Sequence, residues 1–132
     1  MNVVDTSGWV EYFTDSANAD FFAQPIREAE YLVTPTICLY EVFKRVLLEF
    51  GEERALDAVG LMTQGEVVKL DQATAIEAAR ISVNLKLAMA DSIILATAQT
   101  YSATLWTQDE HFKGMPGVKY IEKRDLQRIC PE

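Results

Sequence analysis

The 132-residue sequence contains one histidine and two cysteines, and this scarcity excludes several kinds of catalytic site. A Ser-His-Asp triad or a Cys-His dyad would have to use His111. A zinc site with several histidines is impossible, because the chain has only one. Cys38 and Cys130 lie far apart and match no metal-binding spacing. We therefore expect a reduced, cytoplasmic protein in which carboxylates are the side chains available for catalysis.

Long hydrophobic runs and signal-peptide features are also missing. An apolar run such as residues 93–96 is far shorter than the roughly 20 residues that a membrane span requires, and no basic start leads into an apolar stretch. Hydrophobic residues make up 49% of the chain and charged residues 24%, which is typical of a globular protein. This length and composition predict a single domain over residues 1–132, with no membrane partner.

Positive charge is scarce and unevenly distributed. Twelve Lys and Arg residues stand against twenty Asp and Glu residues, for a formal net charge of −8. Residues 1–66 carry four basic and twelve acidic side chains, whereas residues 67–132 carry eight of each. Such a protein is not a general electrostatic binder of nucleic acids. RNA binding would require a local basic patch, or metal ions that reverse the local field.

Short apolar stretches alternate with longer segments of helical periodicity. The alternation predicts an α/β fold, a parallel sheet with helices on both faces, because parallel strands require crossover connections. Strands are expected at residues 2–4, 31–33, 67–70, 104–106 and 118–121. Helices are expected at residues 9–13, 19–28 (interrupted by Pro25), 36–50, 52–62, 71–87, 91–101 and 123–129.

Two acidic residues follow predicted strands directly. Asp5 comes after the first strand and Asp109 just beyond the strand at 104–106. Ligands of parallel sheets bind at the carboxyl ends of the strands, so these carboxylates should meet at one edge. Each also has a plainer interpretation as the N-cap of the turn that follows, and Asp91 is a competent N-cap too.

Glu41 lies within a strongly apolar helical segment. It could form a surface ion pair with Arg45, one turn later, worth about 0.3–0.5 kcal/mol. Alternatively, Glu41 could join the three aspartates in one pocket, where mutual repulsion would raise some of their pKa values and lower stability. Mg²⁺ or Mn²⁺ would remove that repulsion. The separations of these acids along the chain do not distinguish the two interpretations.

Four short segments together resemble the motifs of PIN domains, and most closely those of the VapC toxins of VapBC toxin–antitoxin systems. They are Val3-Val4-Asp5-Thr6-Ser7, Pro35-Thr36 running into Tyr40-Glu41-Val42, residues 90–98, and Thr107-Gln108-Asp109. The resemblance extends over the whole chain with the segments in matching order. It implies a three-layer α/β/α fold with a short central parallel sheet, and a Mg²⁺- or Mn²⁺-dependent endoribonuclease that uses metal-activated water.

The same resemblance implies roles for individual residues and partners. The family's metal-binding acids match Asp5, Glu41, Asp91 and Asp109, and its hydroxyl residues match Thr107 and Ser7 or Thr6. It further implies a homodimer and a cognate VapB-type antitoxin. We expect the substrate to be a structured RNA such as tRNA.

Two other functions remain open from the sequence. A phosphotransferase could use Asp5 as its nucleophile, although such enzymes commonly carry a second acid where this chain has Ser7. A non-catalytic α/β module could use the acids only to bind a cation or a basic partner. His111 is predicted to be a surface residue without a chemical role.

Overall fold

The computed structural model describes residues 1–124, in which all paired strands are parallel. A parallel bridge between Asn2 and Leu32 connects a two-stranded and a three-stranded group, so the strand order across the molecule is β3-β2-β1-β4-β5. The strands are β1 (Asn2–Val4), β2 (Val33–Pro35), β3 (Glu66–Val68), β4 (Thr104–Thr107) and β5 (Val118–Tyr120).

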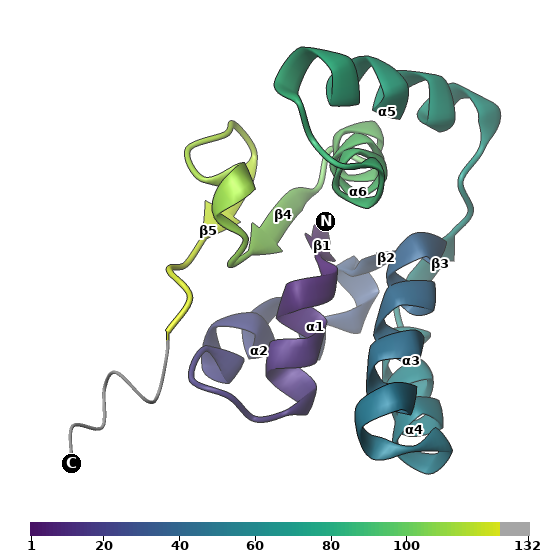
Figure 1. The fold of residues 1–132 in the computed structure, drawn as a ribbon, viewed down its shortest axis with the longest axis vertical. Coiled ribbons are helices and arrows are strands. Elements are labelled where there is room, and N and C mark those ends of the chain that lie inside the picture. Colours follow the sequence, from purple (N-terminus) through teal and green to yellow (C-terminus); the bar gives the residue numbers. More distant parts are fainter. Residues whose placement is uncertain (125–132) are drawn as a thin grey trace.

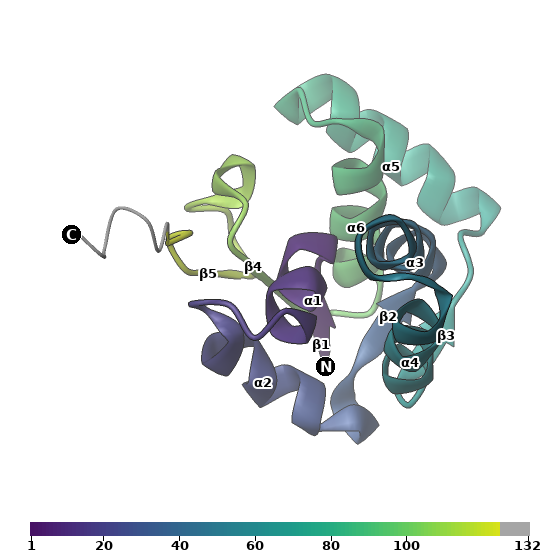
Figure 2. The same ribbon diagram turned by 60° about the horizontal axis from the view of Figure 1, so that its bottom comes forward.

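Helices fill the connections between these strands, which confirms the predicted α/β fold class (Figure 1). In both Figure 1 and Figure 2, α1 lies between α2 and α3. The part of the chain that the structure describes contains α1 (Thr6–Phe13), α2 (Ala19–Arg27), α3 (Thr36–Phe50), α4 (Glu52–Met62), α5 (Gln72–Leu85), α6 (Met89–Thr100), and the short 3₁₀ helices η1 (Ala29–Tyr31) and η2 (Glu110–Phe112).

The start of α1 is packed tightly against β1 and α2. A side chain added at Gly8 would place its Cβ 2.5 Å from the Phe22 ring and 2.8 Å from a Val4 methyl carbon. Phe22, Val4 and Trp9 are all fully buried. This close approach fixes the first turn of α1 over the end of β1, where residues 5–7 are found.

The predictions for α3 and α4 are confirmed at both ends. Apolar residues at helical spacing extend from Thr36 to Phe50, and Gly51 ends α3 with a positive φ of 92°. Asp71 caps α5 as predicted, because its side chain accepts a hydrogen bond of 2.8 Å from the Thr74 amide. That helix ends at Leu85 rather than Leu87.

Three other predictions are wrong. The strand expected at 31–33 lies at 33–35, because Tyr31 is 51% exposed while the side chains of β2 are buried. The strand expected at 67–70 begins and ends earlier, at 66–68. Pro25 does not interrupt α2: it lies in the last turn, with its ring buried, and the helix ends two residues later at Arg27.

The helix predicted at 123–129 falls almost entirely outside the described residues. Lys123 and Arg124, the two of its residues that lie inside, have no regular secondary structure. Within residues 1–124, no single helix is long and apolar enough to cross a membrane.

Candidate metal centre

Asp5 lies where β1 ends and α1 begins. Its Oδ1 accepts hydrogen bonds from the Gly8 amide at 2.9 Å and from the Ser7 hydroxyl at 2.8 Å. Its Oδ2 accepts a bond of 2.5 Å from Thr107 Oγ1. The side chain is only 3% exposed. Asp5 is therefore both the N-cap of α1 and a buried carboxylate at the edge of the sheet.

Thr107, the last residue of β4, connects two of the predicted acids. Its hydroxyl donates to Asp5 and accepts a hydrogen bond of 2.9 Å from the Asp109 amide. Because β1 and β4 are neighbours in the sheet, their ends bring Asp5 and Asp109 to the same edge. The predicted meeting of these two segments is thus observed.

Glu41 does not form the predicted alternative ion pair with Arg45. Arg45 instead pairs with Glu49 at 2.9 Å, on the exposed side of α3. The Glu41 carboxylate accepts a hydrogen bond of 2.5 Å from Thr6 Oγ1, the residue after Asp5. The helix turns Glu41 toward α1, so a hydroxyl orients it just as Ser7 and Thr107 orient Asp5.

Asp91 is not an N-cap, contrary to the interpretation considered from the sequence. α6 begins at Met89 with Ala88 as its N-cap, which places Asp91 in the first turn. One ligand atom each from Asp91, Asp109 and His111 lie within 4.8 Å of one another. This spacing suits three donors around one cation.

His111 is the site residue that sequence reasoning missed. Its ring is 70% exposed, as predicted for a surface residue, but Nδ1 lies 2.9 Å from Asp109 Oδ1. The same carboxylate oxygen accepts a hydrogen bond of 3.0 Å from the His111 backbone amide, because Asp109 is the N-cap of η2. The available signal was the spacing of two residues across a short turn, which alone indicates no function.

Burial first, and the closeness of the other acids second, raise the pKa values of two carboxylates in the cluster. Burial raises the pKa of Asp5 to about 6, with a contribution from the charge of Asp109, while hydrogen bonds from Thr107, Gly8 and Ser7 oppose the rise. Burial also raises the pKa of Asp91, and the charges of Asp109 and Glu41 add to this effect. A nearby cation would stabilise the ionised forms.

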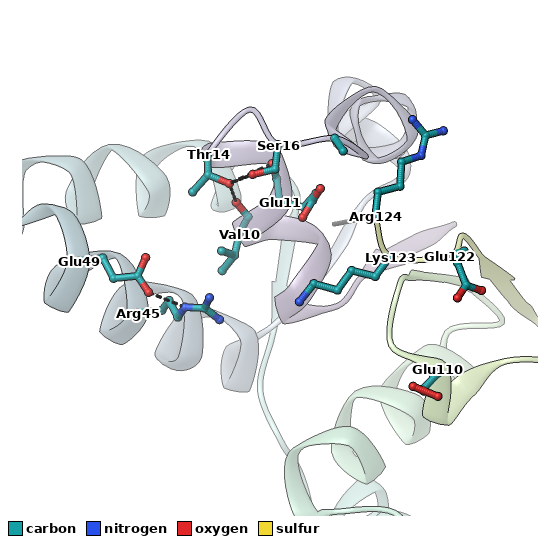
Figure 3. A pocket seen from close by; sticks show the side chains of 11 residues that line it. Val10, Glu11, Thr14, Ser16, Arg45, Glu49, Glu110, Glu122, Lys123 and Arg124 are labelled. Carbon is teal, nitrogen blue, oxygen red and sulfur yellow. Dashed lines mark hydrogen bonds and ion pairs between the residues drawn. The ribbon is translucent and has the colours of Figure 1, made fainter. Parts of the chain in front are cut away.

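Basic side chains line cavities that also contain two of the acids, Glu41 and Asp109. Lys44 and Arg45 line a cavity of about 300 Å³ together with Thr6 and Glu41. A larger groove of about 680 Å³ runs along α1, and Figure 3 shows Arg45 and Lys123 extending toward each other over it. Glutamates line the same groove, so its positive charge is confined to the neighbourhood of the basic side chains.

We expect Thr107→Val to lower activity of the site by roughly 10- to 100-fold, the usual range for a group that orients a metal ligand. Valine fills the same buried volume but cannot donate to Asp5 or accept from the Asp109 amide. Thr97→Val is the matched control, because Thr97 is buried like Thr107 and its hydroxyl donates a hydrogen bond of 2.7 Å to the Ile93 carbonyl of its own helix. Equal turnover in the two variants would contradict this role for Thr107.

Comparisons with known proteins agree with this geometry. Residues 3–118 match the sequence profile of the PIN domain. A search of curated proteins finds no match. In structure, the chain is similar to a chain of a toxin–antitoxin complex from Klebsiella pneumoniae, with a TM-score of 0.76 and 25% identity, covering 90% of this chain and 96% of that chain.

Two further solved structures share the fold at lower sequence identity. One is a VapC toxin of Mycobacterium tuberculosis that cleaves the sarcin–ricin loop, with a TM-score of 0.74 and 16% identity, covering 88% of this chain and 95% of that chain. The other is DNA-bound VapBC from Salmonella typhimurium, with a TM-score of 0.70 and 20% identity, covering 92% and 98%.

Proposed function

Because the chain belongs to the PIN-domain family, we propose that it is a VapC-like endoribonuclease, the toxin of a VapBC toxin–antitoxin pair. It hydrolyses phosphodiester bonds of RNA. The observation that carries this proposal is the meeting of four acid-bearing segments at one edge of the sheet, where Thr6 and Thr107 orient two of the carboxylates. The structural likeness to a toxin–antitoxin complex supports the toxin role.

The donor set fits a divalent cation. Carboxylate oxygens are the ligands that Mg²⁺ and Mn²⁺ prefer, and Asp5, Glu41, Asp91 and Asp109 would hold one or two such ions. An imidazole nitrogen, which His111 would add, suits Mn²⁺ and later transition metals better than Mg²⁺. When bound, the metal supplies positive charge for the phosphate and lowers the pKa of a water molecule.

Hydrogen bonds from neighbouring side chains orient the acids before a metal ion binds. Thr107 fixes one oxygen of Asp5 and the Asp109 backbone, while Ser7 fixes the other Asp5 oxygen. Such prior orientation avoids rearrangement during the reaction. Lys44 and Lys123 lie where they can contact phosphates on either side of the cleaved bond, which positions RNA without reading its sequence.

The proposal extends to the partners. A cognate VapB-type antitoxin binds this chain, the chain forms a homodimer in the cytoplasm, and the substrate is a structured RNA such as tRNA. The likeness to a toxin–antitoxin complex and to VapBC supports the antitoxin. Co-expression with a neighbouring small reading frame, followed by purification through a tag on that partner, should recover both chains.

Cleavage of total cellular RNA by the purified, partner-free protein tests the enzyme. Discrete fragments should appear with Mg²⁺ or Mn²⁺ and disappear with a chelator. A folded, metal-loaded protein that leaves RNA intact would favour the non-catalytic binding module instead.

A further inference from the structure

Gln108 stands between two residues of the metal centre and is itself almost completely buried. It follows Thr107 and precedes Asp109, and its side chain is 5% exposed. Its Nε2 donates a hydrogen bond of 3.0 Å to Glu11 Oε1, and its Oε1 accepts one of 2.9 Å from Asn18 Nδ2. The amide is therefore held at both of its ends.

Glu11 is a buried carboxylate, and hydrogen bonds rather than an ion pair hold it in place. It is 8% exposed and accepts a second bond, of 2.8 Å, from the Asn18 backbone amide. Among residues 1–124, no Lys, Arg or His pairs with it. Burying an acid without an opposite charge is unfavourable unless its hydrogen bonds are well made. In Figure 3, Glu11 is seen beside the groove that runs along α1.

These contacts attach the segment 107–109 to α1 at a second point. The first point is the bond from Thr107 to Asp5 at the start of the helix. The second is the bond from Gln108 to Glu11, one turn beyond Ser7. Thr107 is also held by the sheet, because its carbonyl accepts a hydrogen bond of 3.0 Å from the Ile121 amide, whereas Gln108 lies beyond the end of β4 and its contact with Glu11 fixes the direction of the chain there. The direction of this segment determines where the Asp109 carboxylate lies.

We propose that Glu11, Asn18 and Gln108 form a positioning triad that holds Asp109 in register with the other acids of the metal centre. In this role the triad supplies no metal ligand of its own and acts through Asp109. This inference rests on the proposed function, and it adds three residues that none of the family motifs explains as ligands.

An exchange of the two side chains gives a sharp test. Q108E alone places two carboxylates in contact where an amide now meets a carboxylate. The double variant E11Q/Q108E restores one amide and one carboxylate in exchanged positions. All three hydrogen bonds of the triad remain available, because the amide at position 11 can donate to the acid at position 108 and accept from the Asn18 backbone.

The readouts are the Kd for Mn²⁺, from the electron paramagnetic resonance signal of free Mn²⁺, and kcat and KM for RNA cleavage measured separately. Q108E should weaken Mn²⁺ binding and lower kcat by roughly 10- to 100-fold, with little change in KM. The double variant should recover most of both losses. If Q108E does not fold, Q108M and E11Q are measured instead and should show losses in the same direction.

Met62→Ala controls for a general loss of stability, because Met62 is a fully buried residue of α4. It should lower the unfolding midpoint and leave the Kd for Mn²⁺ unchanged. Triad variants with wild-type Mn²⁺ affinity and kcat, or a double variant no better than Q108E, would overturn the positioning role alone. A wild-type protein that neither binds Mn²⁺ nor cleaves RNA would overturn the proposed function as well.

Discussion

Asp91→Asn is expected to lower the rate of RNA cleavage by about 1000-fold, because metal ligands supply several kcal/mol of transition-state stabilisation. Asparagine has nearly the same size but no negative charge to hold the cation. Asp91 is not the N-cap of α6, so the start of that helix does not depend on its carboxylate. The variant should keep the far-ultraviolet circular dichroism spectrum of the wild type while kcat for a defined RNA substrate falls.

Asp71→Asn is the appropriate control for this experiment. Asp71 also lies at the start of a helix and caps it, but it stands at α5, outside the acidic cluster. Its replacement should leave cleavage unchanged. Wild-type turnover by Asp91→Asn would show that the assignment of the metal centre is wrong.

The metal-free protein is expected to lose stability as the pH rises from about 4 to about 6. Burial raises the pKa of Asp5 from 3.8 to about 6 in the folded protein, so the folded state binds more protons than the unfolded state across this interval. The free energy of unfolding then falls with increasing pH, by about 3 kcal/mol in total for this group. Asp91 shifts in the same direction. Denaturant unfolding at several pH values, compared with Asp5→Asn, isolates the contribution of Asp5.

Divalent metal should reverse this loss at pH 7. An ion present at 100 times its Kd adds about 2.7 kcal/mol to the free energy of unfolding. Asp5→Asn should show a smaller gain, since it removes one of the charges that attract the ion. Sodium chloride at equal ionic strength is the control. Unfolding that is insensitive to millimolar Mn²⁺ beyond this control would contradict a cluster of mutually repelling carboxylates.

Local signals in the sequence account for much of the fold. The apolar spacing that ends at Gly51 predicted α3 correctly, and the acids directly after β1 and β4 indicated the correct edge of the sheet. The strand expected at 31–33 was wrong because Tyr31 favours a strand by type but faces solvent, and exposure depends on the whole fold.

The contacts within the site were harder to predict, since they join residues distant in sequence. Local spacing allowed Arg45 as a partner of Glu41 and left a shared pocket open as well, but in the structure Thr6 donates to Glu41 because α1 packs beside α3. The pairing of Gln108 with Glu11 spans 97 positions and likewise depends on tertiary structure. Four short motifs indicated which residues to consider, and only the three-dimensional arrangement gives their contacts.

The order of the strands has a consequence for the protein during its own synthesis. β1 is made first, but its neighbour β4 begins only at Thr104, and the hydroxyl that orients Asp5 comes from Thr107. A chain still growing on the ribosome carries Asp5, Glu41 and Asp91 without the segment that completes the centre. Under the proposed function, a toxin built in this order cannot cleave RNA until most of its chain has emerged from the ribosome.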